Sequence, residues 1–233
     1  MRRLIAALVV LIAVSMGSAD ATWTYIAGPI WTTYSVSHTG FSGGFYYGDG
    51  TSYKGGVSLA TFSLSASPWP SGYQWLGGPT YYCADMSEWI APSNRTYYWT
   101  NDAVAGISIQ GTAAGNRRAA WILSNHSSST DGSIKRAALQ LAIWEAIYDN
   151  GATLDLTKGN FKVGSLAGGS SADYSAIRTY AATYYGGSSE DGLGVYAYDQ
   201  QNLLRGVPEP GTVILLGLAL AGSGIVLLRR RRS

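Results

Sequence analysis

The stretch SIKRAALQLAIWEAIYD, residues 133–149, decides the fold class of this chain of 233 residues. Its apolar side chains recur at helical spacing and Gly151 follows as a stop signal, so the pattern predicts a helix. Two shorter segments are also predicted to be helical. They are residues 116–124 (NRRAAWILS) and 171–185, the second of which opens with Ser-Ala-Asp and closes before two glycines. A helical cluster is therefore expected in the second half of the chain.

Short β-prone runs surround this cluster. Apolar and small polar residues alternate in residues 30–36 (IWTTYSV) and 57–64 (VSLATFSL), which is typical of antiparallel strands. The glycine-rich residues 40–56 between them predict hairpin turns, because no GK[ST] ends the segment and no helix pattern follows, as a phosphate loop requires. Further strands are predicted at residues 79–85 and 192–204. We expect an α+β fold, with an antiparallel, barrel-like β part and an inserted helical cluster.

Both ends of the chain have the pattern of targeting segments. Residues 1–21 contain two arginines, an apolar run and a closing Ala-Asp-Ala, which is the layout of a signal peptide for the Sec translocon. Residues 212–228 are apolar and uncharged, about the minimum length for a transmembrane helix. Arg229 to Arg232 follow and should stay cytoplasmic. The body, residues 22–206, is then a single extracellular domain of a size that can bury a sizeable core.

The charges argue against a nucleic-acid partner. The overall net charge is +2, but the two ends hold six of the sixteen basic residues, which leaves ten basic and twelve acidic residues in the body. The basic balance thus comes from the targeting segments, and nothing in the body indicates an electrostatic surface for nucleic acid.

The reactive side chains are few. Cys83 is the only cysteine, so no intramolecular disulfide can form, and with only His38 and His126 there is no zinc-binding spacing. A cysteine hydrolase would pair Cys83 with His126, which sits in a polar loop-like setting, and this is the least favoured reading. Asp85 and Glu88 read as solvated charges or turn formers. We predict no catalytic residue, no metal, no cofactor and no enzymatic activity.

Two motifs resemble signatures of the thioester domains at the tips of Gram-positive surface adhesins. Tyr82-Cys83-Ala84-Asp85 is similar to their aromatic-Cys-apolar-acidic run, and residues 139–144 (LQLAIW) are similar to their Thr-Gln-x-Ala-apolar-Trp helix. The resemblance covers residues 82–204. It implies an intramolecular thioester, formed when the cysteine sulfur attacks a glutamine side-chain carbonyl and ammonia leaves. It also implies that Gln140, Trp144 and Asp85 support this bond.

The glutamine partner has two candidates. The family's partner lies in a late strand, which here points to Gln201, although an Asp-Gln pair precedes it and Asn202 follows where an apolar residue is expected. Gln200 therefore stays open as the alternative. Strand alternation favours Gln201, since it would share a face with Val195, Ala197 and Leu203.

Each of these residues also has a purely structural interpretation. Cys83 would then be a small buried hydrophobic residue and Gln140 a polar residue at the edge of a packed helix. As a thioester, in contrast, a lone exported cysteine escapes oxidation and crosslinks the sheet to the closing strand.

The C-terminal segment resembles a second family. Pro208-Glu209-Pro210, the apolar span and the arginine block are similar to the PEP-CTERM sorting signal of Gram-negative bacteria, residues 207–233 here. This resemblance implies that an exosortase, a membrane transpeptidase, cuts near Pro-Glu-Pro. It also implies a link to extracellular polysaccharide and biofilm.

The sequence therefore predicts an exported protein with two alternative functions. In the first, the thioester attaches the protein covalently to an amine on a surface protein or matrix component, for adhesion. In the second, the protein is a structural or polysaccharide-binding matrix module with an inert Cys83. In both, the chain is anchored in the inner membrane before processing and then moves to the cell surface or matrix.

Overall fold

The computed structural model describes residues 27–66, 80–86, 95–100, 111–126, 132–192, 194–198 and 202–206. The elements in these ranges are β1 (Ala27–Tyr47), β2 (Ser52–Ser65), β3 (Tyr81–Cys83), β4 (Arg95–Thr100), α2 (Ala113–His126), α3 (Gly132–Tyr148), β5 (Lys162–Ala167), α4 (Ser171–Tyr185), β6 (Gly194–Tyr198) and β7 (Leu203–Gly206). An antiparallel sheet together with these helices agrees with the predicted α+β class.

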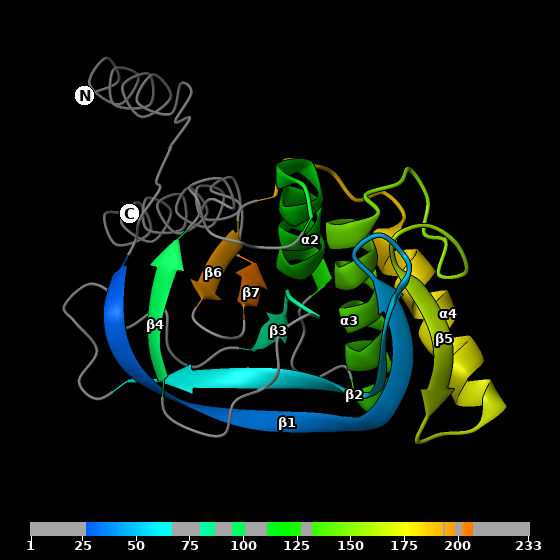
Figure 1. The fold of residues 1–233 in the computed structure, drawn as a ribbon, viewed down its shortest axis with the longest axis horizontal. Coiled ribbons are helices and arrows are strands. Elements are labelled where there is room, and N and C mark those ends of the chain that lie inside the picture. Colours follow the sequence, from blue (N-terminus) through cyan, green and yellow to red (C-terminus); the bar gives the residue numbers. More distant parts are fainter. Residues whose placement is uncertain are drawn as a thin grey trace, which may run out of the picture.

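The described strands form one sheet in the order β2-β3-β7-β6-β4-β1-β5, and β2 also pairs with β1. Strand β1 is long and curved, so it pairs with β4 through its first residues and with β2 and β5 further along (Figure 1). The pairing of β2 with β1 brings together the two ends of the run β2-β3-β7-β6-β4-β1, and β5 extends from β1, the strand with which it pairs. Sequence patterning had not indicated β5.

The glycine-rich segment 40–56 is mostly strand rather than turn. The turn between β1 and β2 is confined to residues 48–51, where Gly48 and Gly50 have φ values of 76° and 77° that favour glycine. The flanking glycines belong to the strands, whose register shifts between His38 and Ser42 and again between Gly43 and Phe45. Such irregularities bend a strand pair and give β1 part of its curvature.

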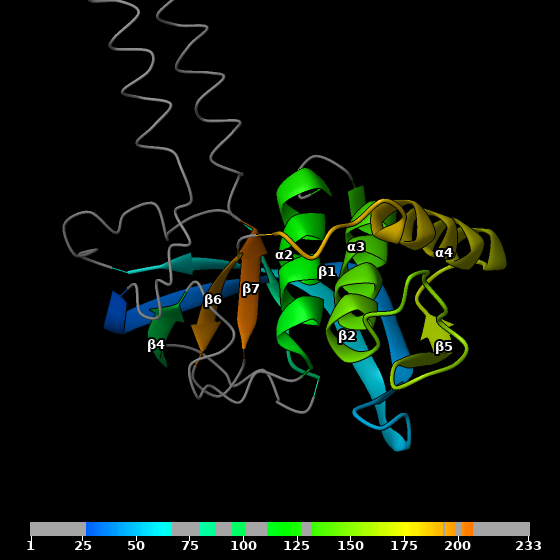
Figure 2. The same ribbon diagram turned by 90° about the horizontal axis from the view of Figure 1, so that it is seen from above.

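Helix α3 is the centre of the core. Every residue from Ala137 to Tyr148 is buried, so the helix is covered on all sides. It lies beside α2, contacts α4 and packs against β1 and β2 (Figures 1 and 2). Its Trp144 ring lies 5.3 Å from the ring of Phe45 and 6.0 Å from that of Phe161, between centroids. The helix predicted at 133–149 is thus confirmed to within one residue at each end.

The other predicted helices also form. Helix α2 begins three residues before the predicted 116–124 segment and ends two residues after it. Helix α4 has the predicted bounds, and a capping box starts it: the Ser170 hydroxyl accepts from Asp173 N, while the Asp173 carboxylate accepts from Ser170 N.

The single strand predicted at 192–204 is instead two strands. β6 and β7 are antiparallel neighbours, with Ala197 opposite Leu203 and Tyr196 opposite Leu204. Val195 and Leu203 therefore lie on two different strands, and the strand-face argument for Gln201 over Gln200, which assumed one continuous strand, loses its basis.

The predicted targeting segments lie outside the described residues. These are the signal peptide, residues 1–21, and the apolar span, residues 212–228. Within the described ranges, none of the helices combines the length and apolar character needed to cross a membrane.

A glycine controls how closely α2 and α3 approach. A Cβ atom on Gly115 would lie 2.3 Å from the carbonyl oxygen of Ala146, so the Gly115→Ala variant must push the two helices apart. We expect it to lower the free energy of unfolding by about 2 kcal/mol. The matched Gly151→Ala variant, whose Cβ would lie 3.4 Å from its nearest neighbour, should change it by less than about 0.5 kcal/mol. Urea unfolding of both variants tests this, and equal losses would contradict it.

Candidate functional site

Cys83 is the last residue of β3, between β2 and β7. Tyr82 is opposite Thr61 of β2 and Leu204 of β7, and Cys83 is opposite Leu203. The side chains of β3 are buried, and Cys83 itself is 8% exposed. The lone cysteine therefore lies buried at the end of a central strand.

Gln140 of α3 holds both backbone polar groups of Cys83. Its Oε1 accepts from the Cys83 N–H at 3.1 Å, and its Nε2 donates to the Cys83 carbonyl at 2.8 Å. The Gln140 side chain is 1% exposed. Buried backbone groups must be hydrogen-bonded, and here a helix side chain does what a neighbouring strand does elsewhere.

The residues after Cys83 turn back toward β7. The Cys83 thiol donates to the carbonyl of Asp85, with 3.0 Å between Sγ and oxygen. The Ala84 N–H donates to the Asn202 carbonyl at 2.8 Å, and the Asn202 Nδ2 donates to Asp85 Oδ2 at 3.2 Å. Asp85 and Asn202 are both buried. Asn202 thus binds the segment that follows the cysteine through its backbone and its side chain.

Met86 closes this segment. Its N–H donates to the Tyr148 hydroxyl at 2.9 Å, and its carbonyl accepts from Lys54 Nζ at 2.7 Å. Gln140 and Tyr148 are two helical turns apart on α3, so the helix runs alongside the residues from Cys83 to Met86. Burial, and next the charge of Asp85, raise the pKa of Tyr148 well above its ordinary value, so this hydroxyl stays protonated.

Trp144 lies one turn after Gln140 and packs in the aromatic core. Its indole N–H is buried and has no hydrogen-bond partner in the described part of the chain. Two of the predicted supporting residues, Gln140 and Asp85, thus form hydrogen bonds with Cys83 itself. The third, Trp144, contacts Phe45 and Phe161 instead.

The two glutamines and the sorting residues cannot be placed in the same way. Gln200, Gln201, Pro208, Glu209 and Pro210 lie outside the described residues. In sequence, however, Asn202 is bonded to Gln201, and Asn202 hydrogen-bonds to Ala84, the neighbour of Cys83. The described contacts therefore bring the cysteine to the point in the chain that directly follows Gln201.

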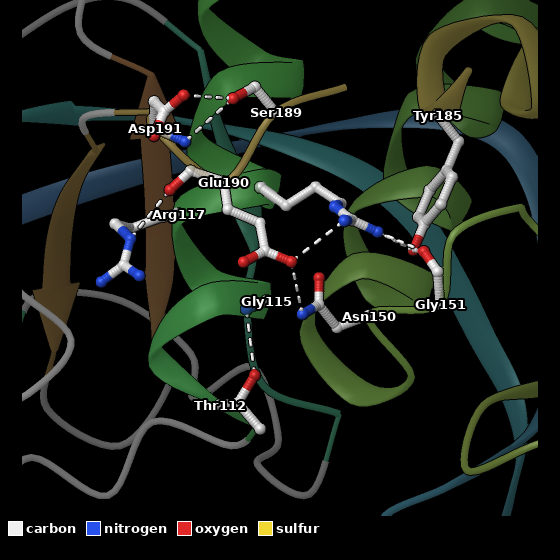
Figure 3. Close-up of polar contacts among 10 residues, drawn as sticks. Thr112, Gly115, Arg117, Asn150, Gly151, Tyr185, Ser189, Glu190 and Asp191 are labelled. Atoms are coloured by element: carbon white, nitrogen blue, oxygen red, sulfur yellow. Dashed lines mark hydrogen bonds and ion pairs between the residues drawn. The ribbon is translucent and has the colours of Figure 1, made fainter. Parts of the chain in front are cut away.

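A polar network that the sequence analysis missed anchors the chain before β6. The Arg118 guanidinium donates to Glu190 and to the Tyr185 hydroxyl, both at 3.0 Å, and also to the Gly151 carbonyl. Glu190 also accepts from the Asn150 side chain at 3.1 Å, as Figure 3 shows. The network joins α2, the end of α3, the end of α4 and the segment that leads to β6. The Arg-Arg pair inside a helix was its only sequence signal.

The position of His126 gives no support to a cysteine hydrolase in which this histidine pairs with Cys83. Its ring lies 4.9 Å from that of Tyr184 and 6.0 Å from that of Trp121, between centroids, at the end of α2. The thiol of Cys83 instead donates to a backbone carbonyl. In the residues that the structure describes, no group of three or more metal-ligating side chains occurs.

Glu145 of α3 is an unusual buried acid. It is 1% exposed; its Oε1 accepts from Asp155 N at 2.8 Å, while Oε2 has no partner within the described ranges. Burial raises its pKa from 4.5 to about 7, against the hydrogen bond from Asp155, and the charges of Asp149 and Asp155 add to the increase.

Comparison with known proteins bears on the C-terminal segment. Residues 206–232 match the family model described as the PEP-CTERM protein-sorting motif. The chain carries a PEP-CTERM motif. The resemblance noted for this segment is thereby confirmed, and the motif indicates an exported protein that an exosortase processes at the membrane. No curated protein and no solved structure matches the chain.

The Gln140 bridge makes a first prediction. Gln140→Leu keeps the side chain's size but leaves the Cys83 N–H and carbonyl buried without these partners. We expect the free energy of unfolding to fall by about 2–4 kcal/mol. The control is Asn125→Leu, which removes an exposed side-chain amide that donates to the Trp121 carbonyl of its own helix. This variant should alter the free energy of unfolding by less than about 0.5 kcal/mol. Equal effects of the two variants in denaturant unfolding would show that the bridge has no special weight.

Glu145 makes a second prediction, on pH. The folded protein keeps the Glu145 proton up to about pH 7, whereas the unfolded chain loses it near pH 4.5. Stability should therefore fall as pH rises between these values, by up to about 3 kcal/mol, and level off above.

Glu145→Gln should remove this slope in denaturant unfolding at several pH values. Glu190→Gln, the same change at a carboxylate whose side chain is 43% exposed, should keep it. An unchanged slope in Glu145→Gln would assign the pH dependence to another group.

Proposed function

We propose that the exported domain carries a thioester between Cys83 and Gln201, with Gln200 as the alternate partner, and that it attaches covalently to amines on a surface protein or matrix component. The Sec translocon exports the chain, the C-terminal segment holds it in the inner membrane, and exosortase processing releases it to the cell surface or matrix. Its role there is adhesion.

The observation that carries this proposal is the contact between the cysteine segment and Asn202. Cys83 is opposite Leu203, and Ala84 and Asp85 both hydrogen-bond to Asn202. The acyl donor of an internal thioester must lie beside the sulfur, and Gln201 is the residue bonded to Asn202. Two motifs that are 57 residues apart, around Cys83 and Gln140, also meet as the thioester resemblance requires.

The chemistry needs such a fixed site. A side-chain amide is a poor acyl donor, so sulfur and carbonyl must be held in near-attack geometry, an effect worth several kcal/mol of barrier. The residues from Cys83 to Met86 are held along their length by hydrogen bonds with four side chains, those of Gln140, Tyr148, Lys54 and Asn202. Once formed, the thioester is a stored electrophile that an amine opens in a single-use reaction.

Intact mass spectrometry tests the proposal. The purified protein should be about 17 Da lighter than its sequence through loss of ammonia, and methylamine should add about 31 Da. Cys83→Ala should show its full sequence mass and no methylamine adduct; processing shortens both proteins equally, so it cancels in the comparison. A full mass in the wild-type protein, with a thiol that alkylates under native conditions, would refute the thioester.

The polysaccharide-binding alternative is favoured by exposed aromatic side chains. Tyr53 is 55% exposed on β2, its ring 5.0 Å from that of Tyr46, with Lys162 stacked over Tyr46. Such rings suit stacking on sugars, whatever the state of Cys83. This function predicts that Tyr53→Ala lowers binding to the extracellular polysaccharide of the bacterium that makes the protein, whereas Cys83→Ala leaves this binding unchanged.

A further inference from the structure

Three side chains form a row on the outer face of the sheet, across β2, β1 and β5. Tyr46 of β1 is opposite Tyr53 of β2 and opposite Lys162 of β5 in the strand pairing. Directly opposite residues of antiparallel strands point to the same face. The neighbouring Phe45 is fully buried and points the other way, toward Trp144 of α3. The row therefore lies on the face turned away from the helical core, where β5 runs beside β1 (Figure 1).

The Tyr53 ring lies along the sheet because the glycines beneath it leave room. A Cβ atom on Gly44 would overlap the Tyr53 hydroxyl and lie 2.7 Å from the ring carbon that carries it. Cβ atoms on Gly55 and Gly164 would lie 3.4 Å and 3.5 Å from opposite edges of the same ring. These glycines belong to β1, β2 and β5, so backbone covers one face of the ring. The residue is nevertheless 55% exposed, which leaves the other face open.

Tyr46 and Lys162 place a second ring and a cation next to this surface. The centroid of the Tyr46 ring lies 5.0 Å from that of Tyr53, and the two planes are tilted by 50°. Lys162 Nζ lies 5.0 Å from the Tyr46 centroid, a cation–π contact that orients the ammonium. Among the residues that the structure describes, Lys162 forms no ion pair. A flat ring, a tilted ring and a positive charge thus lie side by side on one face.

The charges of these three strands favour a negative ligand. β1, β2 and β5 together contain two lysines and neither aspartate nor glutamate. One of the lysines, Lys54, donates to the Met86 carbonyl, so Lys162 supplies the positive charge of the row. The acid that follows in the turn after β1 is Asp49, whose carboxylate accepts from the Thr51 N–H and hydroxyl. Electrostatic attraction at this face should therefore act on an anion.

The same face suits a sugar better than a protein partner. In the described part of the chain, the exposed large hydrophobic residues are Tyr53 and Tyr180, and Tyr180 lies on α4. A protein interface needs a core of several apolar side chains, which this face does not offer. A sugar ring has an apolar C–H face that can stack on an aromatic ring, and hydroxyls that bind polar groups at its edge. A carboxylated sugar would also bring the negative charge that Lys162 attracts.

We propose that Tyr53, Tyr46 and Lys162 form a binding site for an acidic polysaccharide that contains uronic acids, an inference that rests on the polysaccharide-binding function named above as the alternative. A sugar ring stacks on the open face of Tyr53, with Tyr46 at its edge, and a uronate carboxylate pairs with the Lys162 ammonium. Binding is reversible and does not use Cys83, so the site serves the protein whether or not it also attaches covalently.

Two matched polymers test the ligand class on the purified full-length protein. They are alginate, a chain of uronic acids, and the same alginate with its carboxyl groups reduced to alcohols. Calorimetry at low salt should show binding to alginate, and about threefold weaker binding to the reduced polymer. Lys162→Met should bind the two polymers equally, whereas Lys162→Arg should keep the preference. Tyr53→Ala should weaken binding to both about 10-fold, whereas Tyr53→Phe, which keeps the ring, should bind as wild type.

A glycine variant tests the position of the Tyr53 ring without removing a binding side chain. Gly44→Ala should displace the ring and weaken binding to both polymers, while Gly55→Ala, whose Cβ makes an ordinary contact, should not. Two further controls, Tyr180→Ala and Lys135→Met, remove the same kinds of side chain from a second ring–lysine pair, on α4 and α3. Both should bind alginate as wild type. The thermal midpoint of each variant shows that it is folded.

The outcomes separate this site from the function on which it rests. If the wild-type protein binds neither polymer but binds the extracellular polysaccharide of its own bacterium, polysaccharide binding stands and the uronic acid ligand is overturned. If it binds none of the three, the polysaccharide-binding function itself fails. Alginate binding that Tyr53→Ala and Lys162→Met leave unchanged would place the site elsewhere. A wild-type dimer that Tyr53→Ala dissociates in sedimentation would make this face a protein interface, which also overturns the proposal.

Discussion

The two hydrogen bonds between the Gln140 side chain and the Cys83 backbone are the constraint on which the site depends. Pairing of β3 with β2 stops at Tyr82, and successive residues of a strand direct their polar groups to opposite sides. Gln140 takes the place of the next strand residue as the partner of the Cys83 N–H and carbonyl. Helix and sheet are joined at the residue whose sulfur would react.

The arrangement of the neighbouring residues follows from this joint. With Gln140 at Cys83 and Tyr148 at Met86, α3 lies parallel to the segment that turns back to Asn202. Because α3 is buried on all sides, it cannot shift without opening the core. The Arg118 side chain also binds Glu190 and thereby holds the chain that leads to β6. The helical cluster therefore holds the cysteine segment and the chain that leads to β6.

Much of the candidate site could be predicted from the sequence, because its chemistry lies in short motifs. Cys83, Asp85 and Gln140 were chosen from local patterns, and the PEP-CTERM motif was recognised from a Pro-Glu-Pro, an apolar span and arginines. Lys54, Tyr148 and Asn202 could not be chosen, since their role depends on which strands and helices meet. Trp144 was chosen as a supporting residue, and the structure shows it in the aromatic core.

The sequence by itself determined the helices, the PEP-CTERM motif and the presence of one cysteine and a glutamine-bearing helix, because periodicity and motif composition are local properties. Only the tertiary structure decided the sheet order, the edge strand β5 and the break between β6 and β7. It also decided that Cys83, Gln140 and Asn202 come together from three distant segments. Their contacts follow from burying α3 against a curved sheet, a constraint that acts between segments and leaves no periodic signal in any one of them.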